Sequence, residues 1–376
     1  GYTLAGNYIG LGADGNTDLG NGSDGVNIHG EVQDNIVGPG NIISGNDRCG
    51  VSFTAATLSI ANNPEYHISA PSAPGNRVIG NYIGTDSNAT ISRGNSWSGV
   101  CLYTLTHDNT IGGDTAADRN IISGNEQSGI YIYGDQADDN IVSGNYIGTT
   151  VNGRNPLGNS EYGVYIGNGA QDNTIGGDTP VEGNVISENL SGIYIESLDT
   201  TGNTISNNLI GTTADGIWAL GNENDGVHFS FGAQDNTVGP ANTIAHNGGD
   251  GVRVDTPLAF GNTITQNRIH SNDNGIDLSN GGNNAITPPE ISATTSGSVD
   301  ITGTACANCT VEIFTNGDID GEGETYIGST TASPGGDFTL TVSYLRQPYL
   351  TATTTDAVDG TSEFSAVFTA TVPLLY

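Results

Sequence analysis

Short apolar segments recur along most of the chain, and polar turns separate them. Each has the form Gly-apolar-x-apolar, as in Gly163-Val-Tyr-Ile, so alternate side chains fall on one side of an extended strand. A four-residue strand buries too little apolar surface to fold alone. The pattern therefore predicts short β-strands that stack on neighbouring copies. Nine inward-facing pairs follow: Val26/Ile28, Val51/Phe53, Val100/Leu102, Ile130/Ile132, Val164/Ile166, Ile193/Ile195, Val227/Phe229, Val252/Val254 and Ile276/Leu278.

A longer repeat contains these strands. The block Asn-Tyr-Ile-Gly begins at Asn7, Asn81 and Asn145, and related blocks begin at Asn208 and Asn267, at spacings of 74, 64, 63 and 59 residues. Each unit holds two coils, and each coil holds three short strands. Such a period is typical of solenoids, and nine coils at the ~4.8 Å strand spacing predict a rod of about 40 Å. We expect Asn and Gly at the corners, because both tolerate positive φ and buried amides can bond to one another along the stack.

One stretch shows the coil pattern whole. Residues Asn120 to Ile132 read Asn-x-Ile-Ser-Gly-Asn-x-x-x-Gly-Ile-x-Ile, which resembles the right-handed parallel β-helix repeats of pectate-lyase-like proteins. A longer version, with Ile147-Gly-Thr and Leu157-Gly-Asn before Gly163, resembles a group of large secreted bacterial surface proteins. The resemblance covers about residues 1 to 290. It implies an all-β fold, a right-handed parallel β-helix of about nine three-strand coils.

The pattern changes after Pro288 and Pro289. The Asn-x-Ile rhythm stops there, and Thr-rich alternating strands follow, for example at 310–315, 338–342 and 349–354. Two domains are therefore expected: the β-helix over 1–289, and a small antiparallel β-sandwich with an apolar C-terminal tail over 290–376. The stretch from Gly303 to Phe314 resembles immunoglobulin-like modules that are appended to bacterial surface proteins.

The net charge of the chain limits the classes of molecule that it is expected to bind. Forty-one Asp and Glu residues stand against eight Arg and no Lys, and the formal net charge is −33. Nucleic acid and anionic membranes select basic surfaces, so neither is expected as a partner, and cations are favoured. No run of about 18 apolar residues predicts a membrane span. A chain that begins at Gly1 without Met is expected to be processed or truncated, and we predict an extracellular or cell-surface location.

Four cysteines fall into two classes. Cys306 and Cys309 form a Cys-x-x-Cys across a predicted turn, and a disulfide between them suits an oxidising extracellular setting. A zinc site would need two further ligands, and a redox motif would normally open a helix. Cys49 and Cys101 stand far apart, and the sequence assigns them no role.

An acidic loop in the C-terminal part of the chain is a candidate calcium-binding site, so calcium is the expected cofactor. Oxygen-bearing side chains occupy every second position, with Gly321 at the sixth, which resembles the start of a calcium loop. Ile327 stands at the twelfth position, where a bidentate Glu is standard, so a Glu within the loop would have to substitute. A solvated acidic turn is the alternative. The predicted ligands are Asn316, Asp318, Asp320, Glu322 and Glu324.

The outward position of the middle strand should form one column of side chains along the rod. Three successive tyrosines in it, Tyr131, Tyr165 and Tyr194, are candidates to stack on sugar rings, and the alternative is that they stabilise the sheet face. Asp138-Asp139 is the only adjacent Asp pair, but no Gly-His-Gly or Arg-x-Lys accompanies it, so no catalytic residue is predicted. The column is Asn27, Ser52, Cys101, Tyr131, Tyr165, Tyr194, His228, Arg253 and Asp277.

The sequence therefore favours an extracellular structural or adhesive surface protein without catalysis, such as a head-to-tail fibre subunit. Regular repeats, an appended sandwich and the apolar tail from Phe368 to Tyr376 motivate this hypothesis. The expected partners are other copies of the chain or surface glycans. The alternative is a polysaccharide lyase or hydrolase, or a glycan-binding module, that acts on the β-helix face.

Overall fold

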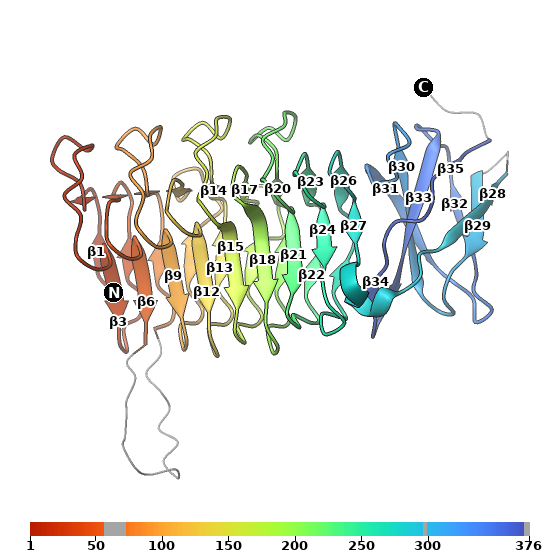
Figure 1. Cartoon of the computed structure of the whole chain (residues 1–376), viewed down its shortest axis with the longest axis horizontal. Helices are drawn as coiled ribbons and strands as arrows, with labels where there is room; N and C mark the ends of the chain where they lie inside the picture. The colour runs from red at the N-terminus through yellow and green to blue at the C-terminus, as the bar shows by residue number, and fades with distance from the viewer. Residues whose placement is uncertain (56–72, 296–298, 372–376) are drawn as a thin grey trace, which may run out of the picture.

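The computed structural model describes residues 1–55, 73–295 and 299–371, so the end of the predicted apolar tail lies outside the described residues (Figure 1). Within these residues, the first three quarters of the chain wind into a solenoid whose coils each contribute one strand to each of three parallel, nine-stranded sheets. The predicted three-strand coil and the predicted number of coils are both confirmed.

Sheets 1 and 2 consist of very short strands, because a corner interrupts the chain after two or three extended residues. Sheet 1 contains β1 (Thr3–Leu4), β4 (Ile36–Val37), β7 (Arg77–Val78), β10 (Thr110–Gly112), β13 (Ile141–Ser143), β16 (Thr174–Gly176), β19 (Thr204–Ser206), β22 (Thr237–Val238) and β25 (Thr263–Ile264). Sheet 2 contains β2 (Tyr8–Ile9), β5 (Ile42–Ile43), β8 (Tyr82–Ile83), β11 (Ile121–Ile122), β14 (Tyr146–Ile147), β17 (Val185–Ile186), β20 (Leu209–Ile210), β23 (Thr243–Ala245) and β26 (Arg268–His270).

Sheet 3 carries the Gly-apolar-x-apolar segments and has the longest strands of the solenoid. The predicted inward pairs all belong to one apolar core that runs along the axis, with Val26 partly buried at its open edge. The strands are β3 (Val26–His29), β6 (Val51–Thr54), β9 (Val100–Tyr103), β12 (Ile130–Tyr133), β15 (Tyr162–Gly167), β18 (Ser191–Glu196), β21 (Val227–Ser230), β24 (Val252–Val254) and β27 (Ile276–Asp277).

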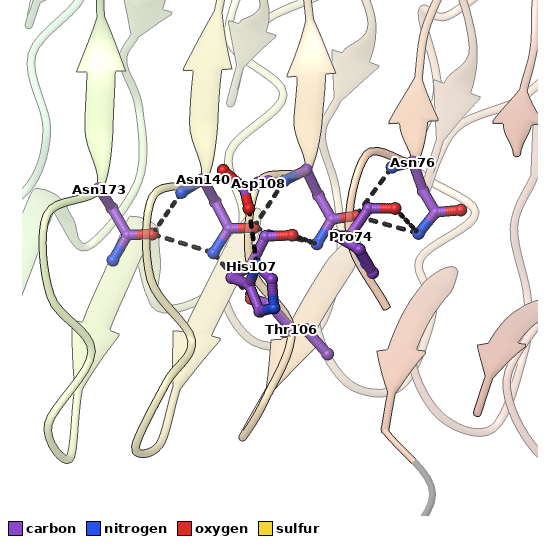
Figure 2. Close-up of polar contacts among 8 residues, drawn as sticks. Pro74, Asn76, Thr106, His107, Asp108, Asn140 and Asn173 are labelled. Carbon is purple, nitrogen blue, oxygen red and sulfur yellow. Dashed lines mark hydrogen bonds and ion pairs between the residues drawn. The ribbon is translucent and has the colours of Figure 1, made fainter. Parts of the chain in front are cut away.

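Three ladders of asparagines hold the corners, as the sequence predicts for buried amides. In each ladder, the side-chain amide of one Asn donates to the Oδ1 of the Asn in the next coil. Figure 2 shows one such step, in which both the backbone N–H and Nδ2 of Asn140 lie 3.0 Å from Oδ1 of Asn173. Every ladder therefore has a direction, with donors facing the C-terminal end.

The first, third, fifth and seventh coils carry a longer loop between sheets 2 and 3, whereas the last two coils both have short connections there. These loops stand on one side of the rod, at the top of Figure 1, and each is closed by an isolated bridge such as Thr85 to Ser92. They bond to one another across the intervening coil, because the amide of Ser87 donates to the carbonyl of Gly15 (3.1 Å) and that of Val151 to the carbonyl of Ala89 (3.1 Å). The alternation of long and short coils thus forms a separate loop stack.

The chain leaves the solenoid through a short 3₁₀ segment, η1 (Ser279–Ala285), and becomes antiparallel from β28 onward. Two antiparallel sheets enclose a second, separate core. One contains β28 (Glu290–Thr294), β29 (Val299–Thr304) and β32 (Asp337–Val342). The other contains β30 (Thr310–Asn316), β31 (Thr325–Thr331), β33 (Tyr349–Asp356), β34 (Gly360–Thr361) and β35 (Phe368–Thr369).

This antiparallel unit covers the last coil (Figure 1). Phe364 packs against the end of the solenoid core. Glu312 accepts from the Gln266 amide (2.9 Å), and Glu322 accepts from Nδ2 of Asn272, the last Asn of its ladder, at 3.0 Å. The acidic side chains supply acceptors to amide donors that would otherwise meet no further coil.

Both cysteine pairs form disulfides. The predicted bond between Cys306 and Cys309 is confirmed. Cys49 and Cys101, to which the sequence assigned no role, are also joined, across a sequence separation of 52 residues. Since Cys49 precedes β6 and Cys101 lies in the adjacent strand β9, the bond joins two neighbouring coils.

Candidate functional site

The predicted column of outward side chains exists on sheet 3. The parallel register aligns Tyr131 with Tyr165, Tyr165 with Tyr194, and Tyr194 with His228, and the same register continues to Arg253 and to Asp277. Towards the N-terminus, it aligns Asn27 with Ser52, Ser52 with Cys101, and Cys101 with Tyr131. One face of the rod therefore carries a continuous row of chemically varied side chains.

More aromatic rings gather on this face than the column alone supplies. Tyr131 and Tyr165 stack with centroids 4.6 Å apart, and Tyr162 stacks on Tyr194 at 4.5 Å. Tyr133 lies 5.3 Å from Tyr131, and Tyr103 lies 6.1 Å from it. We call these six tyrosines the tyrosine cluster: Tyr103, Tyr131, Tyr133, Tyr162, Tyr165 and Tyr194.

Two of the three predicted sugar-stacking residues are mostly covered by their neighbours. Tyr165 is 7% exposed and Tyr194 is 9% exposed, while Tyr131 is partly exposed. The Tyr165 hydroxyl donates to Glu196 (2.5 Å). Burial is the larger cause, and this hydrogen bond the smaller one, of a raised pKa for Tyr165. Stacking among the tyrosines stabilises the sheet face, and Tyr131 remains the more accessible of the three rings.

A cavity of about 540 Å³, the aromatic cavity, opens at the N-terminal margin of the cluster. Its lining includes Trp97, Tyr103, Tyr131, Tyr133 and Glu161. Trp97 is 38% exposed, and the guanidinium of Arg48 lies 4.5 Å from the centre of its ring. Burial raises the pKa of Glu161, and among the described residues no group hydrogen-bonds to its carboxylate.

A second cavity of about 500 Å³, the polar cavity, lies at the other end of the cluster. Nδ1 of His228 lies 3.2 Å from a carboxylate oxygen of Asp225, and the other oxygen accepts from the Asp250 amide (2.9 Å). Asp250 accepts from Nδ2 of Asn274 (2.7 Å). Within the described chain, Nε2 of His228 is buried without a hydrogen-bond partner. The lining includes Tyr162, Tyr194, Asp225, His228, Asp250, Arg253 and Asp273.

The surroundings shift the pKa values of the two buried aspartates in the polar cavity in opposite directions. Burial disfavours the ionised form of Asp225, but hydrogen bonds from His228 and the Asp250 amide outweigh it, so the pKa of Asp225 lies below its usual range. Burial raises the pKa of Asp250. Adjacent carboxylates with opposite shifts provide one ionised group and one that retains its proton more readily.

The sequence contained a signal for this cavity. Asp225 and Asp250 each stand in an Asp-Gly-Val block directly before a strand of sheet 3, and Asp24 does the same in the first coil. The sequence pattern places these aspartates at equivalent corners, but only the geometry shows that two of them meet His228 and Arg253. Trp97 gave no such signal, since it lies in a polar turn.

The predicted calcium ligands do not converge in this arrangement. Glu322 binds Asn272 in the solenoid, Nδ2 of Asn316 donates to Thr351 (3.0 Å), and Glu324 accepts from Gln347 (2.9 Å). Nowhere in the described chain do three or more His, Cys, Asp or Glu residues gather in a metal-binding arrangement. The five side chains do not fit one cation as they stand, and calcium binding stays a prediction.

The pair Asp138 and Asp139 lies in the corner between β12 and β13. Asp138 accepts from the amide of Gln171 in the next coil (2.7 Å), while Asp139 is exposed at positive φ. The pair thus shapes a corner, and it is not among the residues that line the two cavities.

Comparison with known proteins bears on the architecture. A family model described as "right handed beta helix region" matches residues 150–316. The solenoid is a right-handed β-helix. No curated protein matches the chain. Among the residues that the structure describes, no helix has the length and apolar character needed to cross a membrane.

Two solved structures resemble the β-helix in the path of their backbone. A mutant of the periplasmic alginate epimerase AlgG is 15% identical with a TM-score of 0.41, and the match covers 65% of this chain and 49% of the epimerase chain. Tailspike protein 2 from an Escherichia coli O157:H7 bacteriophage is 8% identical with a TM-score of 0.38, and the match covers 89% and 56% of the two chains. The chain thus spans about half the length of these proteins. Likenesses of this size say nothing about activity.

Proposed function

We propose that the outer face of sheet 3 binds a polysaccharide that lies along the β-helix axis. The observation that carries this proposal is the row of aromatic rings between two cavities on one face. Apolar faces of sugar rings pack on aromatic side chains, and sugar hydroxyls bond to carboxylate and amide groups, which both cavities supply, and to imidazole, which the polar cavity adds. Two disulfides in one chain are consistent with the extracellular setting in which such a polymer would be met.

The two tryptophans of the chain provide a matched test. Trp97 lines the aromatic cavity, whereas Trp218 is 66% exposed on one of the long loops. We expect Trp97→Ala to weaken binding of a glycan identified on an array by roughly tenfold, since one aromatic contact is worth about 1 to 2 kcal/mol. Trp218→Ala should leave the affinity unchanged. If Trp97→Ala and Trp218→Ala bind equally in calorimetry, or if no glycan binds, the proposal is wrong.

The fibre hypothesis from the sequence has no support in these findings. The matched family model describes the β-helix architecture alone. Glycan binding, which was the alternative, is better supported by the lining of the two cavities.

A second candidate function is hydrolysis of a glycosidic bond in the polar cavity. Asp225 and Asp250 stand in adjacent coils, about 4.8 Å apart along the axis, and their pKa values shift in opposite directions. Asp250 would donate a proton to the leaving oxygen, and ionised Asp225 would attack the sugar or activate water.

Release of reducing ends from a bound polysaccharide tests this second function. Asp250→Asn should abolish the release, while Asp235→Asn, which changes an exposed corner residue, should not affect it. A wild-type protein that binds the polysaccharide for days without releasing ends would restrict the function to binding.

A further inference from the structure

The charge of the proposed binding face indicates which class of glycan it accepts. Four carboxylates line the two cavities, from Glu161, Asp225, Asp250 and Asp273, against one guanidinium from Arg253. The Arg253 guanidinium faces a further carboxylate, because its Nε lies 3.8 Å from Asp277. A uronate polymer would bring further negative charge to a face where these carboxylates outnumber the guanidiniums of Arg253 and of Arg48, which lies over Trp97, on a chain of net charge −33.

The aromatic cavity has the composition of a cation site. Aromatic rings attract an ammonium group through their negative faces, and a nearby carboxylate adds to that attraction. Trp97 already receives one cation in this way, from Arg48. The neighbouring Glu161 has no such partner among the described residues, and its partial burial makes its negative charge costly until a cation arrives.

We infer that the glycan is cationic, a polymer of amino sugars whose amines are free rather than acylated, with an ammonium group seated between Glu161 and the rings of Trp97 and Tyr133. This inference rests on the proposed function and specifies its ligand. The carboxylates of the polar cavity then receive a second ammonium group further along the same polymer.

Two oligosaccharides that differ only in charge test the inference. Hexamers of β-1,4-linked glucosamine and of N-acetylglucosamine share one backbone, and only the first is positively charged below neutral pH. Calorimetry should show the glucosamine hexamer binding at least tenfold more tightly, with an affinity that falls as salt is added. Glu161→Gln should weaken glucosamine binding about fivefold or more, and it should weaken any binding of the acetylated hexamer by a clearly smaller factor.

Nonspecific attraction to an acidic protein is controlled by Glu290→Gln, which removes one exposed carboxylate from β28, outside the two cavities. Equal losses in the Glu161 and Glu290 variants would overturn the inference. Equal, Trp97-dependent affinity for both hexamers, or preference for a galacturonate oligomer, would also overturn it while the proposed glycan binding stands. Failure of every saccharide to bind would remove both.

Discussion

Glu322 shows how a single side chain can end a repetitive structure. Along its ladder, each Asn offers Oδ1 to the amide and side-chain nitrogens of the Asn before it. Glu322 does the same for Asn272, accepting from the backbone N–H (3.2 Å) and from Nδ2 (3.0 Å). A carboxylate with no donor of its own thus stands where the next Asn would continue the ladder.

The position of Glu322 makes docking of the antiparallel unit sensitive to pH. Burial raises the pKa of Glu322 from 4.5 to about 7, and nearby Asp320 adds to the shift. The protonated form is therefore favoured in the folded state. Its stabilising contribution is fully present below pH 4.5 and is lost as the pH rises through about 7.

Glu322→Gln is expected to reduce this pH dependence, because Gln offers the same acceptor without a charge. At about pH 8 the variant should be more stable than the wild type by on the order of 2 kcal/mol, and at about pH 5 the two should be similar. Thermal unfolding at both pH values measures the difference. Glu290→Gln, on exposed β28, serves as the control, and a Glu322→Gln profile parallel to the wild type would contradict the expectation.

At the scale of elements, the ladders and the strand register follow from the sequence, but the packing of individual rings does not. Asn before each strand and the alternation around Tyr131, Tyr165 and Tyr194 suffice to predict which residues align. The burial of Tyr165 and Tyr194 depends on how Tyr133 and Tyr162 turn towards them, which no spacing encodes. The partnership of Asn272 with Glu322 depends likewise on the docking of a separate unit, 50 residues later.

An interior ladder position should matter much more than an end position. Asn145 is fully buried, accepts from both nitrogens of Asn120, and donates to Asn184 (3.1 Å) and to the Ile111 carbonyl (2.8 Å). Asn145→Ala would leave several buried groups unpaired, and we expect a loss of about 3 kcal/mol or more in urea unfolding. Asn7→Ala, at the exposed start of the same ladder, should cost less than about 1 kcal/mol. Equal losses would argue against the ladder as the main corner restraint.

The disulfide between coils was not predictable, because the residues between Cys49 and Cys101 lengthen the first repeat to 74 residues and obscure which coil faces which. A bond that closes a loop of this size is expected to stabilise the fold by roughly 4 kcal/mol, because it reduces the conformational entropy of the unfolded chain. Replacing both cysteines with Ser should lower the unfolding midpoint accordingly. The Cys306–Cys309 pair, separated by 3 residues, should have a much smaller effect when replaced in the same way.

At the scale of the whole molecule, the β-helix and the antiparallel unit have separate cores but share an interface. The last coil offers amide donors, and Glu312, Glu322 and Glu363 accept from Gln266, Asn272 and Leu278. Part of the acidic character of the chain thus has a structural use at one end of the rod. The carboxylates on sheet 3 are a different set, which is why binding and stability can be altered by separate substitutions.

The long loops bond to one another across the intervening coil, as the Ala214 amide does to the Gly153 carbonyl (2.9 Å). Removing residues 145–207 would join Gly144 to Asn208 and bring the fourth loop into the place of the third. We expect that variant to fold into a shorter rod with cooperative unfolding in circular dichroism. Removing only residues 174–203, one coil, should prevent folding, because two long loops would then compete for the space of one.

Gene duplication acting on such a chain would therefore be constrained in its step size. A gain or loss of two coils preserves the loop stack, both ends of every ladder and the interface with the antiparallel unit. A gain or loss of one coil among the first seven breaks the loop stack even though the three sheets would tolerate it. The surface loops thus set the size of the unit that duplication can copy, and relatives of this protein should differ by even numbers of coils within the part of the rod that carries the long loops.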